Sequence, residues 1–338
     1  MIFGAGRRAG CRDGSWGRAS TVTARSASRL TLSGCEEAAV DVVVTGARGF
    51  LGRHLVAALN ERPDVDFGLY LDVPCSPKGQ DALSFFREDD QHWDLLIHCA
   101  AVTPHRAAID GRALAVGAGN LALDSAMFEW AARTKPGRVV YLSSSAAYPI
   151  AFQEGDRAYR LTETDIDLLG PDNPDAIYGA VKLMGERLAE AYRAQGGAVT
   201  IVRPFSGYGE DQSSDFPFGA FRDRARRHED PFVIWGDGSQ VRDWVHVDDV
   251  VGAVLAAVDN AVDGPLNIAT GVGTSMADLA AMFAAEAGYA PRFELHPEKP
   301  AGVAYRVGDP TRLNELYTPR VTLAEGVKRA LAARSVNM

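Results

Sequence analysis

The stretch VDVVVTGARGFLG at residues 40–52 decides the fold. Its first part, Val40–Thr45, is a short apolar run rich in β-branched residues, which is typical of a strand buried on both faces of a parallel sheet. A turn with a glycine at every third position follows, and then apolar residues recur at helical spacing until Pro63. The sequence therefore predicts a strand, a tight glycine turn and a helix.

The G-x-x-G-x-x-G spacing of this turn, between a strand and a helix, indicates a dinucleotide site. Gly46 permits the tight bend, Gly49 lets the backbone approach a pyrophosphate, and Gly52 lets the helix pack on the strand. The N–H groups and the dipole at the start of the helix favour a bound phosphate. The predicted cofactor-binding residues of the turn are Gly46, Arg48, Gly49, Phe50 and Leu51.

Asp72 ends the second expected strand, at residues 67–72, and helps to choose between two cofactors. An acidic side chain at this place accepts hydrogen bonds from both adenosine ribose hydroxyls and repels a 2′-phosphate. The sequence therefore predicts NAD as the cofactor. Arg48 could soften that repulsion, which leaves NADP as the alternative.

Strands and helices alternate along the chain that follows. Further apolar strands are expected at residues 94–101, 138–143 and 198–202, with helices near 119–133 and 179–195. This alternation indicates right-handed βαβ crossovers and the α/β fold class, a doubly wound parallel sheet of the Rossmann type. After Arg203 the alternation is less regular, which favours a smaller C-terminal substrate-binding lobe over the carboxyl edge of the sheet.

The predicted domain organisation has three parts. Residues 1–40 lack apolar periodicity and are interpreted as a disordered or mis-assigned leader; a targeting peptide is disfavoured because no apolar segment follows the arginines. Residues 41–205 are expected to form the NAD-binding Rossmann domain, to which residues 241–270 return. Residues 206–240 and 271–338 are expected to form the substrate lobe.

Composition excludes several classes of protein. The chain of 338 residues carries 44 Asp and Glu against 35 Lys and Arg, a formal charge of −9, which argues against a nucleic-acid partner. No apolar run approaches the ~18 residues of a membrane span. The four cysteines show neither a paired framework nor a C-x-x-C spacing, so we expect free thiols, a cytoplasmic location and no metal site.

A second chemical motif is YGAVK, in which Tyr178 and Lys182 lie on one face of an expected helix. A phenol is a poor base at neutral pH, but a neighbouring ammonium group and a cationic nicotinamide ring favour the phenolate. Serines 143–145 end a central expected strand, where a hydroxyl can hold a reacting oxygen. With the glycine turn upstream, these residues indicate a base and a hydroxyl group that act on a substrate beside the cofactor.

In this order the motifs resemble the extended short-chain dehydrogenase/reductase family, which contains nucleotide-sugar epimerases and dehydratases. The resemblance spans residues 41–330 and rests on TGARGFLG, HCAA at His98–Ala101, the serines before Tyr148, YGAVK, Arg203-Pro204, and WGDGSQVRDWVHVDD at Trp235–Asp249. It implies a nucleoside-diphosphate sugar as substrate. It also implies a homodimer through the helices near 120–133 and 179–195, packed as a four-helix bundle.

The resemblance implies roles for individual residues. The implied catalytic residues are Ser144, Tyr178 and Lys182. Further implied cofactor contacts are Ala100, Ala101, Tyr178, Lys182 and Pro204. The implied substrate-binding residues are Ser144, Ser145, Ser206, Arg242 and Lys299. Asn120 resembles a helix asparagine that supports the site, with a simple buried polar residue as the equal alternative.

The residues after Ser144 exclude several of the reactions that the family resemblance would otherwise imply. Family dehydratases and decarboxylases carry an acidic residue there, and the GDP-fucose synthases and 3,5-epimerases carry a cysteine, whereas this chain has Ser145 and Ala146. The remaining reaction is epimerisation at C4 through a transient 4-keto intermediate. A 4-ketoreductase or a 4,6-dehydratase is the alternative, and a dinucleotide-binding sensor is the non-enzymatic one.

The nucleotide base stays open. Lys299-Pro-Ala-Gly302 stands where UDP-galactose 4-epimerases have Arg-x-x-Asp, and it resembles the Lys-Pro-x-Gly of GDP-fucose synthase. Ser206 replaces an asparagine that commonly lies near the diphosphate. Uridine, guanosine and thymidine nucleotides all remain candidates. Four arginines on an expected helix are interpreted as a solvated face, with phosphate contact as the alternative: Arg222, Arg224, Arg226 and Arg227.

Overall fold

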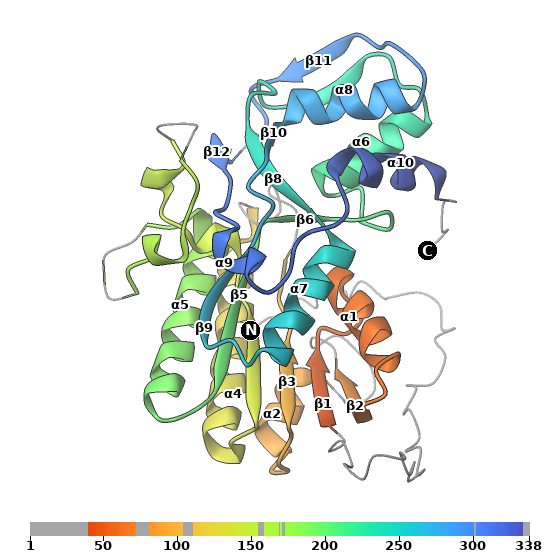
Figure 1. The fold of residues 1–338 in the computed structure, drawn as a ribbon. Helices are drawn as coiled ribbons and strands as arrows, with labels where there is room; N and C mark the ends of the chain where they lie inside the picture. The colour runs from red at the N-terminus through yellow and green to blue at the C-terminus, as the bar shows by residue number, and fades with distance from the viewer. Residues whose placement is uncertain are drawn as a thin grey trace, which may run out of the picture.

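A parallel sheet of six strands in the order β2-β1-β3-β4-β5-β9 forms the centre of the molecule (Figure 1). The computed structural model describes residues 40–71, 81–103, 111–154, 159–168, 170, 173–300 and 302–333. The strands are β1 Val40–Thr45, β2 Val65–Leu71, β3 Leu95–His98, β4 Arg138–Leu142, β5 Val199–Pro204 and β9 Gly264–Ile268. All five pairings are parallel, so the predicted doubly wound sheet is confirmed.

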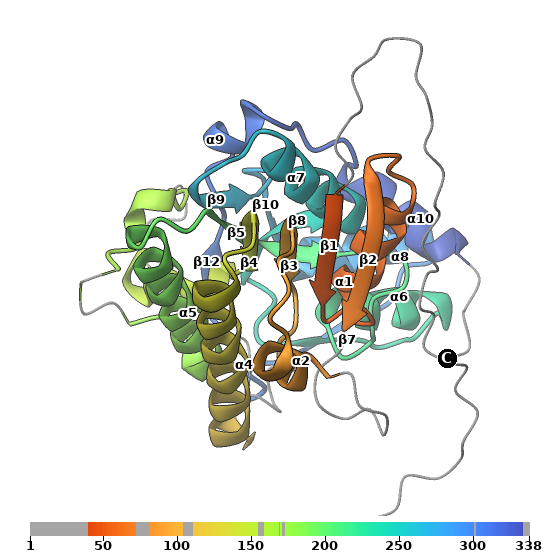
Figure 2. The same ribbon diagram turned by 90° about the horizontal axis from the view of Figure 1, so that it is seen from below.

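Helices cover both faces of this sheet, as Figures 1 and 2 show. One face packs against α1 (Phe50–Asn60) and α7 (Val247–Asp259), and the other against α2 (Ala82–Glu88), α4 (Ala113–Thr134) and α5 (Ala176–Ala194). In β1, Val42 and Val44 belong to the first hydrophobic cluster and Val43 to the second. Because both faces are buried, the strand is apolar at successive positions rather than at every second one.

The strand order reverses around β1, which lies between β2 and β3. In open α/β sheets such a reversal separates the loops that follow the strands and opens a crevice at their carboxyl ends. The register places Thr45 beside His98 and His98 beside Tyr141, so the last residues of β1 and β3 and the next-to-last residue of β4 form one row across the sheet. This row lies directly below the loops that carry the candidate site.

A second lobe lies above the carboxyl edge of the sheet (Figure 1). It contains a small sheet of β6 (Ser206–Tyr208), β8 (Val241–His246), β10 (Gly273–Ser275) and β12 (Tyr305–Arg306), and the pair β7 (Phe232–Trp235) and β11 (Phe293–His296). Its helices are α6 Pro217–Arg226, α8 Met276–Glu286 and α10 Leu323–Ala332, and its core contains Phe218, Phe283 and Val327. The short helix α9 Thr311–Asn314 lies against β9, and the 3-10 helices are η1 Ser145–Ala147, η2 Ile150–Phe152 and η3 Glu163–Asp165.

Residues 241–270 divide between the two sheets. Strand β8 pairs with β6, β10 and β12 in the small sheet, whereas α7 and β9 pack on or join the six-stranded sheet. Backbone pairing decides this, because a strand belongs to the sheet whose hydrogen bonds it shares. The predicted leader, residues 1–40, lies outside the described residues except for Val40, which begins β1.

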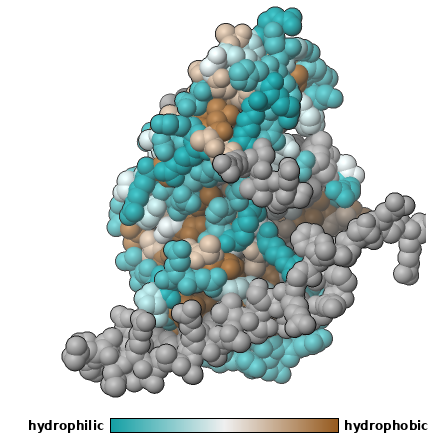
Figure 3. All heavy atoms as spheres, turned by 90° about the vertical axis from the view of Figure 1, so that its right-hand side faces the viewer, coloured by the Kyte–Doolittle hydropathy of each residue, from teal (hydrophilic) through white to brown (hydrophobic). Residues whose placement is uncertain are grey.

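Hydrophilic side chains dominate the face in Figure 3, where the brown apolar areas among the described residues are small and separate. In the part of the chain that the structure describes, every helix is too short or too polar to cross a bilayer.

Candidate active site

A cavity of about 820 Å³ lies between the carboxyl edge of the sheet and the lobe. Its walls come from segments far apart in the sequence: the glycine turn, the loops after β3, β4 and β5, the start of α5, and the start of β8. The predicted site residues that line it are Gly46, Gly49, Phe50, Leu51, Ala101, Ser144, Ser145, Tyr178, Lys182, Pro204, Ser206 and Arg242. The fold thus brings most of the predicted cofactor, catalytic and substrate residues to one cavity.

The remaining predicted site residues lie elsewhere. Ala100 is buried behind Gly46, and the exposed side chain of Arg48 is outside the cavity lining. Lys299 is also exposed and outside the lining, and its backbone N–H donates to the carbonyl of His296 in a turn. Pro300 and Gly302, close by in the sequence, do line the cavity. Asp72 lies outside the described residues.

The glycine turn has the shape that a dinucleotide requires. Gly46 has a φ of +69°, and a Cβ there would lie 2.7 Å from the backbone nitrogen of Ala100. A Cβ on Gly52 would overlap the carbonyl oxygen of Gly46. Gly49 caps α1 and has no side chain to occupy the first N–H groups of the helix. These residues fit the pyrophosphate of NAD, which would be held by the turn and by the start of α1.

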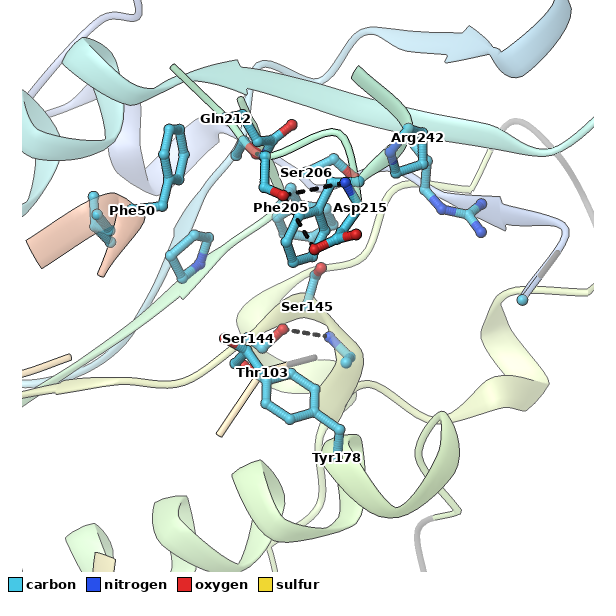
Figure 4. A pocket seen from close by; sticks show the side chains of 18 of the residues that line it. Phe50, Thr103, Ser144, Ser145, Tyr178, Phe205, Ser206, Gln212, Asp215 and Arg242 are labelled. Atoms are coloured by element: carbon cyan, nitrogen blue, oxygen red, sulfur yellow. Dashed lines mark hydrogen bonds between the residues drawn. The ribbon is translucent and has the colours of Figure 1, made fainter. Parts of the chain in front are cut away.

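Ser144, Tyr178 and Lys182 meet at the floor of the cavity. Figure 4 shows the ring of Tyr178, from the first turn of α5, beneath Ser144 at the end of β4. Lys182 lies one helical turn further on, is buried, and donates a hydrogen bond from Nζ to the carbonyl of Leu142 at 2.7 Å. A Cβ on Gly179 would overlap the carbonyl of Ala146, so glycine lets α5 approach the serine loop.

The side chain of Ser143 forms a hydrogen bond within the protein core. Its hydroxyl donates to the buried carboxylate of Glu186, which also pairs with Arg203 at 2.6 Å. Ser144 Oγ instead accepts a hydrogen bond from the backbone N–H of Ala146 at 3.1 Å, so its own proton is available to a ligand. This difference favours Ser144 over Ser143 as the serine that faces a substrate.

The opposite wall contains three residues that the sequence analysis did not consider. Gln240, one residue before β8, and Trp244 of β8 lie two residues on either side of Arg242, so their side chains share its face. Gln240 Oε1, Trp244 Nε1 and Gln212 Oε1 are buried without a hydrogen-bond partner among the described residues. Because side chains alternate along a strand, the positions of Gln240 and Trp244 relative to Arg242 could have indicated both residues from the sequence.

Two carboxylates of the lobe also reach the cavity. Asp215 accepts a hydrogen bond from Ser213 Oγ at 3.1 Å and points toward Ser145 from the opposite wall (Figure 4). Sequence reasoning about acidic groups considered only the neighbours of Ser144 and missed it, because a fold contact is required to find it.

The other carboxylate, Asp211, connects the lobe to α1. It pairs with Arg53 at 2.7 Å and with His54 at 3.1 Å. Burial alone would raise the pKa of Asp211, but the hydrogen bonds from Arg53 and His54 hold it below the ordinary carboxyl value. The ionised carboxylate is therefore favoured at neutral pH, and it joins the two regions at the side of the cavity.

The helix arginines divide among several roles, so their interpretation as one solvated face is wrong. Arg222 is buried, pairs with Asp223 and donates to two loop carbonyls. Arg224 lines the cavity, and Arg226 donates to carbonyls of the C-terminal helix region. Only Arg227 has a mostly exposed side chain. Asn120, also uncertain from sequence, is buried and bonds both backbone groups of Val102, so it supports the loop after β3.

The sequence pattern of the NAD dependent epimerase/dehydratase family matches residues 42–269, more than half of the chain. The chain belongs to this family. The predicted family resemblance is therefore confirmed. The predicted NAD cofactor is confirmed as well, since the family is NAD-dependent.

Relatives within the family perform different reactions. The dTDP-4-dehydro-6-deoxy-D-allose reductase of Streptomyces bikiniensis is 30% identical over 301 residues, which cover 81% of this chain and 90% of that protein. A putative UDP-glucose 4-epimerase of Methanocaldococcus jannaschii is 29% identical over 316 residues, covering 86% and 97%. Epimerases and reductases are thus about equally similar to this chain.

Solved structures of family members share the fold. The UDP-glucose 4-epimerase of Thermotoga maritima, solved with UDP-glucose, has a TM-score of 0.72 and 25% identity, covering 86% of this chain and 97% of its own. MoeE5, solved with UDP-glucuronic acid and NAD, has a TM-score of 0.71 and 27% identity, covering 86% and 98%. The likeness spans both the sheet and the lobe, since it covers most of each chain.

Proposed function

We propose that this protein is an NAD-dependent nucleotide-sugar epimerase that inverts C4 through a transient 4-keto intermediate. The observation that carries the proposal is the cavity itself, which the glycine turn, the Ser144–Tyr178–Lys182 group and Arg242 all line. A ligand with an anionic diphosphate would pair with the Arg242 guanidinium, while its sugar reaches the serine and the tyrosine.

In the proposed reaction, Tyr178 takes the proton of the sugar C4 hydroxyl and later returns it. Lys182 lies one helical turn from Tyr178 on α5, and Ser144 holds the reacting oxygen by a hydrogen bond. Bound NAD supplies the acceptor for the hydride leaving C4 and the donor that returns it. Inversion requires that the keto sugar turn over between the two steps, so the lobe wall must hold the diphosphate while the sugar moves.

The residues next to Ser144 support epimerisation over elimination. Ser145 and Ala146 line the cavity, and neither can remove a carbon-bound proton. Asp215 faces this loop from the opposite wall of the cavity (Figure 4), and its side chain is exposed.

A 4-ketoreductase is the second candidate, favoured by the similarity to the Streptomyces reductases. The same side chains would protonate the product oxygen of a 4-keto sugar, with the reduced cofactor consumed once per turnover. The two candidates differ in redox balance, so one assay separates them.

The test uses the full chain with a panel of UDP-, GDP- and dTDP-sugars. An epimerase converts one sugar to its C4 epimer, seen by NMR, with no net change in NADH absorbance. Stoichiometric NADH or NADPH consumption with a 4-keto sugar identifies a reductase. Failure of every sugar to react in either direction, although the protein binds NAD, contradicts both and favours a dinucleotide-binding sensor.

Tyr178→Phe tests the catalytic group. We expect turnover to fall by about 10³-fold, within the range for loss of a general acid–base group, with NAD binding little changed. Tyr289→Phe is the matched control, because the Tyr289 hydroxyl is buried without a partner in the lobe, among the described residues, and away from the cavity. Unchanged turnover in Tyr178→Phe would refute the assignment.

We also propose a homodimer through α4 and α5. The support is an apolar surface on these helices: Leu114 is 85% exposed, Leu121 39% and Met184 40%. Light scattering of the full chain should give twice the monomer mass, and Leu121→Glu with Met184→Glu should reduce it. The lack of a paired-cysteine pattern in the sequence supports a cytoplasmic location as a further proposal.

A further inference from the structure

A chain of buried hydrogen bonds runs from the glycine turn into the core beneath the candidate catalytic residues. The backbone N–H of Ala100 donates to Thr45 Oγ1 at 3.3 Å. Thr45 Oγ1 lies 2.8 Å from His98 Nδ1, and His98 Nε2 lies 3.2 Å from Asp124 Oδ1. All of these groups are buried, and they belong to β1, β3, the loop after β3 and α4.

Tyr141 extends this chain to Lys182. Its hydroxyl donates to Asp124 Oδ2 at 2.6 Å, and the Nζ of Lys182 lies over its ring, 4.9 Å from the centroid. The same Nζ donates to the carbonyl of Leu142, the next residue of β4. The ammonium group is therefore held by two consecutive residues of one strand, and one of these is fixed by Asp124.

The helix opposite leaves room for this cluster. A Cβ on Gly185 of α5 would overlap the hydroxyl of Tyr141 and would lie 2.9 Å from Asp124 Oδ2. Glycine at this position lets α5 pack directly over the hydrogen bond between Tyr141 and Asp124. The sequence is thus adapted to the cluster on both helices, with a carboxylate on α4 and a gap on α5.

The ionisation states of these residues determine which atom donates in each of the buried hydrogen bonds. Burial opposes the ionisation of Asp124, but the charge of Lys182 and the two hydrogen bonds outweigh it, so the pKa of Asp124 is lowered. Burial lowers the pKa of His98 and raises that of Tyr141, which leaves the imidazole neutral and the phenol protonated. A carboxylate only accepts, so His98 donates from Nε2 and accepts from the Thr45 hydroxyl at Nδ1.

The buried charges balance in pairs. Glu186 and Arg203 form one pair, with Arg203 Nη2 2.6 Å and Nε 3.0 Å from the carboxylate oxygens. Asp124 is then the carboxylate that balances Lys182. The titratable and charged groups that face this cluster are His98 of β3 and Cys99 after it, Tyr141 of β4, Tyr178, Lys182 and Glu186 of α5, and Arg203 of β5 behind Glu186.

We propose that Asp124 is a positioning residue of the active site: through Tyr141 it fixes the place and the charge of the Lys182 ammonium, and through His98 and Thr45 it connects that ammonium to the glycine turn. The proposal rests on the proposed function only in taking Lys182 as the partner of Tyr178. Asp124 itself touches neither substrate nor cofactor, because it is buried below the cavity floor and outside its lining.

Asp124→Asn tests the proposal, because it removes the carboxylate charge and keeps nearly the same side-chain shape. We expect kcat to fall about tenfold and the pH–rate profile to shift, because the variant removes the carboxylate charge that faces the Lys182 ammonium. The Kd for NAD should stay within about twofold, since the glycine turn is intact. A pH–rate profile that coincides with that of the parent protein would overturn the proposal.

Asp249→Asn is the matched control for a purely structural effect. Asp249 is also buried, also accepts a tyrosine hydroxyl, that of Tyr317 at 2.8 Å, and does not line the cavity. Its substitution should lower stability without moving the pH–rate profile. An equal shift in both variants would show that Asp124 acts only through general stability, and would refute the positioning role.

Two further measurements keep the proposal testable if Asp124→Asn does not fold or if no sugar reacts. Tyr141→Phe retains the ring under Lys182 and removes only the hydroxyl, so a smaller shift in the same direction is expected. ¹⁵N NMR of histidine-labelled protein without ligand should show His98, identified by its loss in His98→Gln, as neutral with the proton on Nε2. A charged ring or a proton on Nδ1 would overturn the proposal, whatever the substrate proves to be.

Discussion

The two walls of the cavity differ in how far the hydrogen bonds of their polar atoms are satisfied. On the sheet side, Ser143 is bonded to Glu186, and Lys182 to a backbone carbonyl. On the lobe side, Gln212, Gln240 and Trp244 each keep a buried polar atom without a partner among the described residues. The sheet side is thus arranged before any ligand arrives, whereas the lobe side has buried polar atoms that are open to a ligand.

This difference separates two tasks. A buried polar atom without a partner costs about 1–3 kcal/mol, so such atoms concentrated on one wall mark a place for a polar ligand. The paired groups of the sheet side are suited to a reaction that is shared by the family. The unpaired groups of the lobe side are suited to recognition, which differs from one nucleotide sugar to another.

The largest effect should come from the sheet side, in Gly52→Ala. The new Cβ overlaps the carbonyl of Gly46, so the turn must open, and we expect NAD affinity to fall by at least about 100-fold with a loss of stability of about 2 kcal/mol or more. Calorimetric titration with NAD and thermal unfolding measure both. Gly111→Ala, whose Cβ meets open space, should change neither; equal effects would contradict the account of the turn.

Arg242→Ala removes the cation of the lobe wall. A charge-assisted hydrogen bond contributes about 1.5–3 kcal/mol, so KM for the nucleotide sugar should rise by about 10- to 100-fold. NAD binding should not change, since Arg242 lies on β8 and not at the glycine turn. Steady-state kinetics measure KM for the nucleotide sugar, and calorimetric titration measures NAD affinity. If both binding steps weakened equally, the two walls would not have separate functions.

Gln240→Met tests an unpaired atom directly. Methionine has nearly the shape of glutamine but no amide, so it removes the free Oε1 and also the 2.7 Å hydrogen bond from Nε2 to Asp237. We expect KM to rise by about fivefold, in line with about 1 kcal/mol for one hydrogen bond, with little change in unfolding temperature. An unchanged KM would show that the free oxygen does not contact the ligand.

The smallest effect concerns the contact between the two regions, Asp211 with Arg53 and His54. Since the pKa of Asp211 is lowered in the folded state, its contribution is present above the ordinary carboxyl pKa of about 3.9 and is lost as pH falls through the lower folded value. Its side chain is 34% exposed, so solvent screening limits the contribution to about 1 kcal/mol.

Urea unfolding of Asp211→Asn and the parent protein measures this contribution. The difference in unfolding free energy should be small at pH 7 and should disappear as pH falls below the lowered pKa of Asp211 in the folded state. A difference that grows toward acid pH would have the wrong sign for a carboxylate stabilised in its ionised form, and would refute the assigned interaction.

The sequence by itself determined the parts of this protein that depend on neighbours along the chain. Val40–Thr45 and the glycines after it specify a buried strand and a tight turn, and Tyr178 and Lys182 lie one helical turn apart, so spacing alone predicts their common face. The order of such motifs was enough to predict the parallel sheet and most of the cavity lining.

Only the tertiary structure decided what depends on contacts between distant segments. No local pattern indicates that Asp124 lies beneath Lys182, that Asp215 faces Ser145, or that β8 joins the lobe sheet. Lys299 shows the same limit, because a motif gives a position in the chain while the surrounding fold decides whether its side chain reaches the cavity. Hydrogen bonds and charges act over a few ångströms in space, whatever the separation in sequence, and packing alone sets those distances.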